Sequence, residues 1–360
     1  MQLHTRLNRR TFLAGALGIG IAYALATRRH RVRAINLSNR DLVWVWRFSV
    51  DGQPDEIGAR LLDANLGILL KTNDGLNWMA DFDDSDYAVS GFNQVAVLAN
   101  YYESAGIPFH AWCVISGENP VAEAEMAAQV LWGGARSLHI DLGPESGAWQ
   151  GDAGAAIMFG HELRSLHPDA TLMLALDPRP WVLERVPVAE LATFCDGISV
   201  KELWTTFDHP DGHSEFAENG WPVPAEGITP QFLHAMASEV LGAYGLPLRF
   251  AGDGSTADPD TFRAFLHEAR GPAGLPVSIW RYGLMTDAVL EVLREFPPTA
   301  GGEDSVSGDP AGARRTHIVS QGDTLWAIAG IYGTSVDLIA EANALPDPDR
   351  LSIGQELVIP

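Results

Sequence analysis

The stretch Ser137-Leu138-His139-Ile140-Asp141-Leu142 is a short, mostly apolar run between two longer segments with helical periodicity. The flanking segments are residues 121–131 and residues 155–166. A run of this length is typical of a buried strand, whereas apolar residues three and four apart indicate the buried face of a helix. The stretch therefore predicts one strand of a fold in which strands and helices alternate.

The same alternation extends over residues 42–296 and contains eight apolar runs. Eight strand-helix units in about 255 residues favour a (β/α)8 barrel. A doubly wound sheet would normally have fewer strands and a glycine-rich phosphate turn after the first, and no such turn follows Phe48. We therefore predict an α/β fold, a (β/α)8 TIM-type barrel over residues 41–296. Its expected strands are residues 43–48, 66–70, 108–115, 137–142, 171–176, 197–200, 247–251 and 276–280.

A smaller unit follows this predicted barrel. Residues 297–315, PPTAGGEDSVSGDPAGARR, lack apolar periodicity and are rich in Pro, Gly, Ser and Asp, which is typical of a flexible linker. Residues 316–360 then show a β-α-α-β pattern, with strands at 317–319 and 356–359 and helices that include 325–329 and 336–339. We expect a linker at 297–315 and a small folded domain at 316–360.

The small unit contains a specific set of motifs. They are Gly322-Asp323-Thr324-Leu325-Trp326-Ala327-Ile328-Ala329, Leu338-Ile339 with Asn343 shortly after, Leu351-Ser352-Ile353-Gly354-Gln355, and Ile359-Pro360. Through them the unit resembles the LysM family, small domains that bind N-acetylglucosamine-containing glycans such as peptidoglycan or chitin-like chains. The resemblance implies a shallow groove between two loops, which receives N-acetyl groups through backbone hydrogen bonds and apolar contacts. The glycan-binding residues that it implies are Gly322, Asp323, Thr324, Leu325, Asn343, Ala344 and Leu345.

Some residues of the first motif also fit a structural role. Asp323 or Thr324 can cap the first helix, because a short polar side chain at that position accepts a hydrogen bond from a backbone N–H. Trp326 is spaced with Ala329 as on a buried helix face, so we expect it in the core. For Asp323 and Thr324, the helix cap and the glycan contact both stay open.

Polar and aromatic residues follow the expected strands of the large unit. In a (β/α)8 barrel, binding and catalytic residues lie at the carboxyl ends of the strands. Sugars stack on Trp and Tyr rings, and carboxylates bind sugar hydroxyls or act as acid and base. The pattern therefore predicts a glycan site at the barrel mouth. The strand-end residues are Lys71, Asp74, Asp141, Glu145, Asp177, Arg179, Glu202, Trp204, Asp253, Arg281 and Tyr282.

Several of these residues lie in motifs with a family resemblance. Val43-Trp44-Val45-Trp46, Leu70-Lys71-Thr72-Asn73-Asp74-Gly75, Ile140-Asp141 and Ser278-Ile279-Trp280 are similar to motifs of the glycoside-hydrolase-like barrels that are often joined to LysM modules. The resemblance suggests cleavage of a glycosidic bond. The leading acid and base candidates are Asp141 and Glu145, and the supporting ones are Glu202, Asp74 and Lys71.

One departure from that pattern leaves two hypotheses open. Related lysozyme-type barrels place acids two positions apart at a strand end, whereas here Gly143 stands two positions after Asp141 and the next acid is Glu145. In the first hypothesis, the barrel hydrolyses an envelope polysaccharide while LysM raises its local concentration. In the second, the barrel only recognises glycan, and Asp141 is bonded to loop amides or to Lys71. The missing second acid favours the second.

The N-terminus resembles an export signal. Asn8-Arg9-Arg10-Thr11-Phe12-Leu13-Ala14 precedes an apolar stretch that continues to Ala26, as in twin-arginine signals. We expect residues 1–26 to be this signal and residues 27–40 to be a basic juxtamembrane segment. The alternative is an uncleaved anchor, which would provide the chain's membrane contact. Both interpretations place the protein outside the cytoplasm, in the periplasm, cell wall or medium.

Charge and cysteine usage narrow the function further. All 46 acidic residues lie from Asp41 onward and the chain has a net charge of −22, so we expect no nucleic-acid partner. Cys113 lies inside an apolar run and Cys195 just before one, so both fit buried free thiols. His209 and His213 are four apart, but Pro210 and Gly212 predict a loop there, so we expect no metal site and no cofactor.

Overall fold

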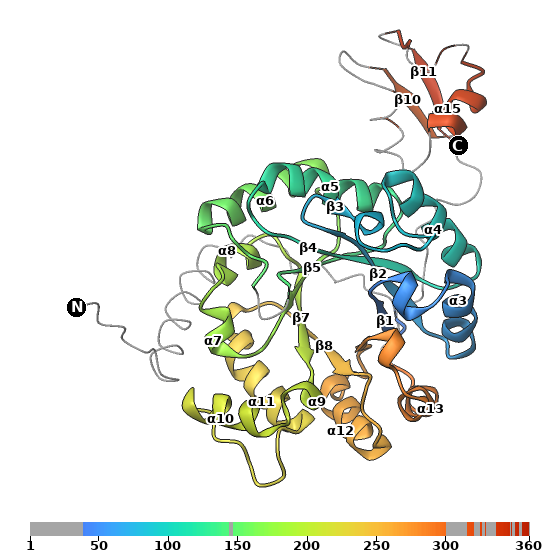
Figure 1. Cartoon of the computed structure of the whole chain (residues 1–360). Helices are drawn as coiled ribbons and strands as arrows, with labels where there is room; N and C mark the ends of the chain where they lie inside the picture. The colour runs from blue at the N-terminus through green and yellow to red at the C-terminus, as the bar shows by residue number, and fades with distance from the viewer. Residues whose placement is uncertain are drawn as a thin grey trace.

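The computed structural model describes residues 39–143, 147–299, 315–319, 325, 328, 336–345, 347, 350–352 and 355–359. Eight parallel strands close into a barrel surrounded by helices (Figure 1), which confirms the predicted α/β fold and TIM-type barrel. A short strand, β3 (Asn77–Trp78), pairs antiparallel with the end of β2. The barrel strands are β1 (Leu42–Val45), β2 (Gly67–Asp74), β4 (Phe109–Val114), β5 (Leu138–Asp141), β6 (Leu172–Leu176), β7 (Gly197–Glu202), β8 (Leu248–Asp253) and β9 (Ser278–Trp280).

The barrel closes through β1, which pairs with β2 on one side and with β9 on the other. Val43 is in register with Ile68 of β2 and with Ile279 of β9. The first strand is shorter than the sequence predicts. It ends at Val45 because the chain turns there into a helix that starts at Phe48, and the turn is held by a bond from the Trp46 N–H to the Asp51 carboxylate, at 2.6 Å.

The helices form the outer layer, and several begin at a proline. Proline suits the first helical position because its missing N–H would be unpaired there. At one such start the carboxylate of Asp258 accepts the N–H groups of Asp260 and Thr261. The helices are α2 (Phe48–Asp51), α3 (Pro54–Asp63), α4 (Phe92–Ser104), α5 (Pro120–Trp132), α6 (Ala153–Leu166), α7 (Pro180–Leu183), α8 (Val188–Ala192), α9 (Trp204–Phe207), α10 (Pro210–Glu218), α11 (Pro230–Leu241), α12 (Pro259–Arg270) and α13 (Asp287–Glu295), with 3-10 turns at Met79–Asp81, Gly242–Tyr244 and Tyr282–Leu284.

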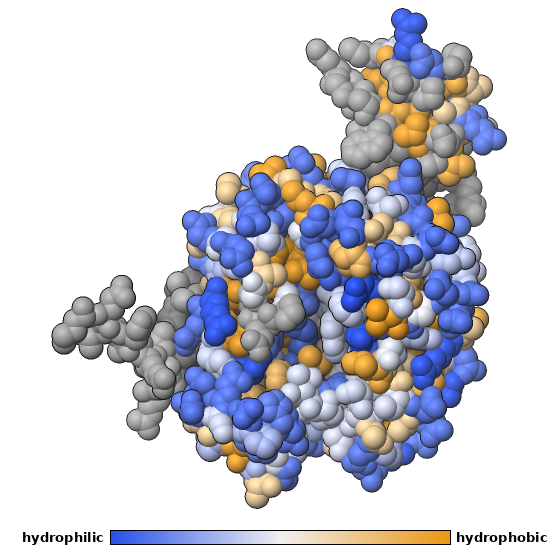
Figure 2. Space-filling model, in the orientation of Figure 1, coloured by the Kyte–Doolittle hydropathy of each residue, from blue (hydrophilic) through white to orange (hydrophobic). Residues whose placement is uncertain are grey.

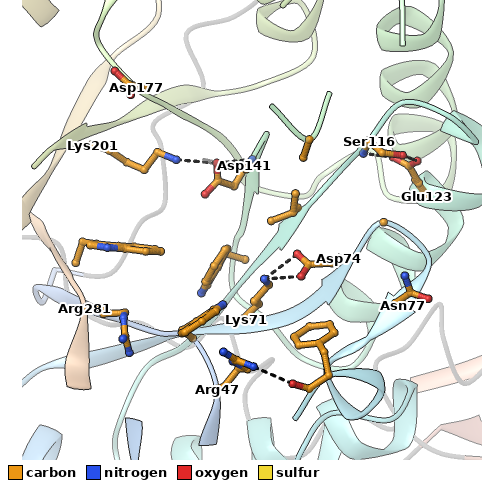
Figure 3. Close-up of a pocket in the computed structure, with 18 of the residues that line it drawn as sticks. Arg47, Lys71, Asp74, Asn77, Ser116, Glu123, Asp141, Asp177, Lys201 and Arg281 are labelled. Atoms are coloured by element: carbon orange, nitrogen blue, oxygen red, sulfur yellow. Dashed lines mark hydrogen bonds and ion pairs between the residues drawn. The ribbon is translucent and has the colours of Figure 1, made fainter. Parts of the chain in front are cut away.

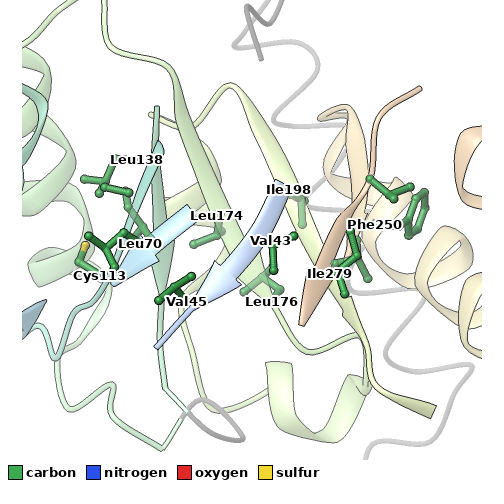
Figure 4. Packing of buried hydrophobic residues seen from close by; sticks show 14 of the residues in the cluster. Val43, Val45, Leu70, Cys113, Leu138, Leu174, Leu176, Ile198, Phe250 and Ile279 are labelled. Carbon is green, nitrogen blue, oxygen red and sulfur yellow. The ribbon is translucent and has the colours of Figure 1, made fainter. Parts of the chain in front are cut away.

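Alternation along each strand separates two apolar layers. Because successive side chains of a strand point to opposite faces, Val43 and Val45 face the helices whereas Trp44 faces the barrel interior. The outer layer is the main core, and Figure 4 shows part of it. Both cysteines are buried free thiols in this layer, as expected. The inner face is therefore the one that supplies side chains to the mouth.

One predicted loop is helical. The segment from Pro210 to Glu218 forms α10, with His209 as its N-cap, where the imidazole accepts the Gly212 N–H at 3.1 Å. Pro210 occupies the first helical position, so it starts the helix instead of breaking it. The His213 ring contacts Asp208 at 2.6 Å, and among the described residues no cluster of three or more metal-ligating side chains is present.

The C-terminal unit has a small core of its own. β10 (Arg315–Ile318) pairs antiparallel with β11 (Glu356–Ile359), and α15 (Val336–Ala342) packs against β11. The buried side chains are Val319, Leu325, Ile328, Ile339 and Leu357. This arrangement agrees with the outer strands and the second helix of the predicted β-α-α-β unit.

Some expectations lie outside the described residues. They concern the signal at residues 1–26, the basic residues up to 38, most of the linker and Trp326.

Hydrophilic residues cover much of the barrel face in Figure 2. Where the structure describes the chain, no helix combines the length and apolarity needed to cross a membrane.

Candidate functional site

A cavity of about 1020 Å³ opens at the carboxyl ends of the strands (Figure 3). Its walls come from strand ends and the loops that follow them, as the barrel fold requires. The fold thereby gathers side chains that are far apart in sequence. The polar and aromatic lining includes Trp46, Arg47, Lys71, Asp74, Phe82, Trp112, Ser116, Glu123, Asp141, Asp177, Arg179, Lys201, Phe207, Trp280 and Arg281.

A cluster of three tryptophans, the tryptophan base, lies at this cavity: Trp112 and Trp280 line it, and the fully buried Trp44 packs against both. The rings of Trp44, Trp112 and Trp280 contact one another edge to face, with centroids 5.3 to 5.6 Å apart. The Trp44 indole N–H donates to the Ser278 hydroxyl at 2.9 Å, and the Trp112 N–H donates to the Val45 carbonyl at 3.0 Å. These bonds satisfy two buried indole donors, so the tryptophan base is fixed before a ligand arrives.

Asp141 stands at the end of β5 and enters this cavity. Its Oδ1 accepts from the Lys201 ammonium at 2.8 Å and from the N–H groups of Leu142 and Gly143, at 2.7 and 3.2 Å. The sequence left open loop amides or Lys71 as its partner. The structure gives the loop amides, with Lys201 in place of Lys71. Three donors on one oxygen hold this carboxylate as an acceptor.

Lys71 pairs with Asp74 instead. Its Nζ lies 2.7 and 2.8 Å from the two carboxylate oxygens of Asp74. It also lies 4.9 Å from the Trp112 ring centroid and 5.0 Å from that of Phe82, which is cation–π geometry. Both predicted supporting residues on β2 therefore line the cavity, joined to each other and to its aromatic wall.

Two arginines of the rim are also held by carboxylates. The Arg179 guanidinium binds Asp177 through both oxygens, with a shortest distance of 2.8 Å, and Glu215 at 3.2 Å. Arg281 pairs with Asp51, which also accepts the Gly283 N–H at 3.1 Å. Burial raises the pKa of Asp51, while its N–H donors and Arg281 oppose the rise. These pairs fix the rim and neutralise its charge.

Glu123 organises the loop after β4. Its carboxylate accepts from the N–H of Ser116 at 2.9 Å, the Ser116 hydroxyl at 2.6 Å and the Gly117 N–H at 3.0 Å. Glu123 was not predicted from the sequence, because the function of a buried glutamate near a helix start becomes visible only when the loop folds over it. Its bonds indicate a positioning role for the loop.

Glu202 does not lie at the mouth, contrary to the prediction. On β7 Lys201 points inward and Glu202 outward, where it is fully buried and its carboxylate lies 3.3 Å from Nδ1 of His234 on α11. Burial raises the pKa of Glu202 to about 7, and the nearby His234 opposes the rise. The alternation from Ser199 onward is the signal that identifies Lys201 as the cavity residue.

Three other expected mouth residues lie away from the cavity. Asp253 is buried and bonded to Thr205 and Ser255. Trp204 packs outside the barrel on Phe262 and Phe265, and Tyr282 is buried near Arg60. Asp253 closes β8, and Trp204 and Tyr282 lie two positions after β7 and β9, where a change of backbone direction decides which way the side chain points.

The absence of an acid two positions after Asp141 has a structural explanation. Gly143 has a φ of +77°, and a Cβ there would lie 2.7 Å from the Cβ of Ala148. A side chain at this position is therefore disfavoured by both backbone conformation and space. Glu145, the predicted partner of Asp141, lies outside the described residues.

The implied glycan residues of the small unit fall into three groups. Gly322, Asp323 and Thr324 lie outside the described residues. Leu325 is buried in the core, and Leu345 is packed against it. The side chain of Asn343 bonds within the domain, whereas Ala344 is exposed with a φ of +49°. Among the four that the structure describes, Ala344 is the exposed one.

The C-terminal resemblance is confirmed by comparison with known families. Residues 317–360 match the family model of the LysM domain, so the chain carries a LysM domain at this position. The cortical fragment-lytic enzyme of Bacillus subtilis is 52% identical over 44 residues, which is 12% of this chain and 10% of that enzyme. The N-acetylmuramoyl-L-alanine amidase XlyA of Bacillus subtilis is 38% identical over 53 residues, 15% of this chain and 18% of that one. The chain thus spans less than a fifth of either relative.

Similar solved structures exist at low identity. The spore cortex-lytic enzyme SleL of Bacillus cereus has a TM-score of 0.45 and 10% identity, covering 73% of this chain and 75% of that one. The glycoside hydrolase domain of PgaB from Bordetella bronchiseptica has a TM-score of 0.41 and 12% identity, covering 71% and 98%.

Proposed function

We propose that this protein is a cell-envelope glycan-recognition protein with two binding places. The LysM domain binds an N-acetylglucosamine-containing glycan, peptidoglycan or a chitin-like chain. The barrel cavity holds a segment of glycan without cleaving it. The observation that carries the proposal is that Trp112 and Trp280, packed on the buried Trp44, line one cavity together with five acidic and five basic side chains.

Sugar rings suit such a cavity for physical reasons. A pyranose ring has an apolar face that packs on an indole and a rim of hydroxyls that bonds to charged groups. Trp280 and Trp46 line the cavity and are partly exposed. The guanidinium groups of Arg47 and Arg281 lie over the Trp46 ring, 3.7 and 5.0 Å from its centroid, so Trp280 is the ring that we assign to sugar packing. Lys71, Asp74, Asp141 and Lys201 supply donors and acceptors in the same cavity.

The surroundings of Asp141 favour recognition over hydrolysis. Glycoside cleavage normally needs a carboxyl group that donates a proton, together with a second carboxylate. Asp141 is held as an acceptor by Lys201 and two backbone N–H groups. Gly143 leaves little room for an acid two positions further on.

Hydrolysis is the second candidate, and one observation supports it. Asp74 and Asp141 line the same cavity, so two carboxylates face a bound glycan. In that case the acid pair would be Asp141 together with Asp74 or with Glu145. Product formation that is lost in Asp141→Asn would identify this hydrolytic activity.

Export is part of the same proposal. The LysM domain and the twin-arginine-like residues 8–14 fit a protein that works at the cell wall or outside the cell. We propose the division into a signal at 1–26, a basic segment at 27–40, a barrel at 41–296, a linker at 297–315 and LysM at 316–360. In the LysM domain we propose glycan contacts along residues 322–325 and 343–345.

The decisive test incubates the full chain with insoluble peptidoglycan and with chitin oligosaccharides. Co-sedimentation reports binding, and mass spectrometry reports new reducing ends. We expect binding without products, and weaker retention of oligosaccharides by Trp280→Leu than by wild type. New reducing ends that disappear in Asp141→Asn would establish the hydrolase instead, and absence of binding to both glycans would contradict the proposal as a whole.

A further inference from the structure

The charge of the cavity differs from that of the rest of the chain. The protein has 46 acidic and 24 basic residues, whereas the cavity is lined by five of each. The basic ones are Arg47, Lys71, Arg179, Lys201 and Arg281. Both lysines of the whole chain, Lys71 and Lys201, are among them. Cations are thus concentrated at this mouth, in a protein whose overall field repels anions.

Four of these cations are matched by a carboxylate. Lys71 is bound by Asp74, Lys201 by Asp141, Arg179 by Asp177 and Arg281 by Asp51. Such pairs place two opposite charges side by side and leave little net attraction for an incoming anion. Arg47 is the remaining cation of the cavity lining, so it is the candidate for binding an anion.

Arg47 has no ion pair with any residue that the structure describes. Its guanidinium lies over the Trp46 ring, 3.7 Å from the centroid, and its Nη1 donates to the Phe82 carbonyl at 3.1 Å. Its Nε is buried without a hydrogen-bond partner. The side chain is therefore fixed in position by the ring and the carbonyl, with donor capacity left over (Figure 3). A planar guanidinium with free N–H groups suits a carboxylate or phosphate.

We propose that the barrel cavity recognises an anionic sugar and that Arg47 binds its carboxylate or phosphate group. This inference rests on the proposed function, since it takes the cavity to be a glycan site. The sugar ring packs on Trp280, and the anion meets Arg47 at the rim. The paired lysines contribute donors to the ring hydroxyls. Neutral sugars bind the same cavity more weakly, because they leave Arg47 without a counter-charge.

Lys71 and Lys201 allow a measurement that reports on ligand binding in the barrel cavity alone. Residues 297–360 contain no lysine, so a full chain labelled with [15N]lysine gives backbone amide signals from Lys71 and Lys201 in the barrel cavity and none from the LysM domain. Titration followed by NMR therefore reports on the cavity alone, even when the ligand also binds LysM.

Four sugars that differ in their charged group show which group the cavity recognises. N-acetylmuramic acid carries a carboxylate, its methyl ester is the matched neutral form, N-acetylglucosamine 6-phosphate carries a phosphate, and N-acetylglucosamine carries neither. We expect at least one anionic sugar to bind about tenfold more tightly than the neutral forms, the usual size of one charge-assisted bond. Comparison of N-acetylmuramic acid with N-acetylglucosamine 6-phosphate shows whether the cavity prefers the carboxylate or the phosphate.

Arg47 variants complete the test. Arg47→Gln should remove the preference for the anion while neutral binding persists, and Arg47→Lys should keep part of it. Equal binding of N-acetylmuramic acid and its ester, with no preference for the phosphate, would overturn the inference and leave the glycan site standing. An anion preference that survives in Arg47→Gln would also overturn it. Unchanged lysine signals with all four sugars would contradict the barrel glycan site itself.

Discussion

Lys201 on β7 and Asp141 on β5 form the central ion pair of the cavity, with 2.8 Å between Nζ and Oδ1. Their side chains are 11% and 5% exposed, so each charge depends on the other for compensation. The strands that carry them are separated by β6 and are 60 residues apart in the chain. The pair thus links two parts of the barrel wall as well as orienting the carboxylate.

Removal of the lysine charge should destabilise the barrel. Lys201→Met leaves Asp141 as a buried charge without its cation, which costs about 3 kcal/mol. Asp141→Asn in the same chain should recover part of that loss, because the uncompensated charge is gone. Urea unfolding of the two single variants and the double variant measures the coupling. Additive effects of the two substitutions would show that the pair contributes nothing to stability.

Glu202 should make stability depend on pH. Its pKa is raised by burial to about 7, above its usual value of 4.5, so the folded state keeps a proton that the unfolded state has already lost. The stabilisation is complete below pH 4.5 and is lost as the pH rises to 7. Across that window the wild type should lose about 3 kcal/mol relative to Glu202→Gln.

The measurement compares the two proteins in urea at pH 4.5 and pH 7.5, with identical ionic strength. The isosteric Gln variant keeps the shape of the site and removes the titration. Parallel pH dependence in the two proteins would mean that Glu202 is ionised throughout.

The fold was largely predictable because its signal repeats. Each strand-helix unit places an apolar run such as residues 171–176 beside an amphipathic helix, and eight repetitions leave few alternatives to a barrel. The end of β1 was not predictable from the apolar run, because Asp51 and Asp83 turn the chain after Val45 through bonds to backbone N–H groups. The helix cap at His209 was likewise not predicted. Pro210 and Gly212 indicated a loop, whereas Pro210 in fact starts α10.

The site was predictable in outline and less so in detail. Asp141, Lys71 and Asp74 lie in the cavity, as the strand-end rule suggests. Glu202 was misplaced by one position, which on a strand reverses the direction of the side chain. Arg47 was overlooked because it lies in the predicted first strand. That it forms no ion pair with a described residue becomes apparent only when its neighbours are seen to be paired.

Gly143 should resist replacement for two separable reasons. A side chain there meets a φ of +77° and a Cβ contact of 2.7 Å with Ala148. Gly106 has the same φ of +77° but nothing within 4 Å of an added Cβ, so Gly106→Ala is a matched control for backbone strain alone. We expect about 1 kcal/mol of destabilisation for Gly106→Ala and about 3 kcal/mol for Gly143→Ala.

The clash can be tested within the same chain. Ala148→Gly combined with Gly143→Ala should restore most of the difference between the two alanine variants, measured by urea unfolding. Equal destabilisation by Gly106→Ala and Gly143→Ala would show that space around Gly143 is not limiting, and that an acid could be accommodated there.

Asn343 should stabilise the LysM domain through its side chain. Its Nδ2 donates to the carbonyls of Ile339 and Val358 at 2.8 and 2.7 Å, and its Oδ1 accepts the Val358 N–H at 2.7 Å. The amide thus joins the end of α15 to β11. Asn343→Ala removes both side-chain bonds to the Val358 backbone, which costs about 3 kcal/mol, while the Ile339 carbonyl keeps the backbone N–H of residue 343 at 3.1 Å. In a domain this small, such a loss is comparable to the whole stability.

The structural role and the implied glycan contact of Asn343 predict different measurements. If the amide holds the domain together, Asn343→Ala lowers the melting temperature of the LysM domain and the retention on peptidoglycan in parallel, while the barrel transition stays unchanged. Glu341→Ala, an exposed neighbour on α15, is the matched control and should alter neither. A LysM domain that melts as in wild type but no longer binds peptidoglycan would instead make Asn343 a direct glycan ligand.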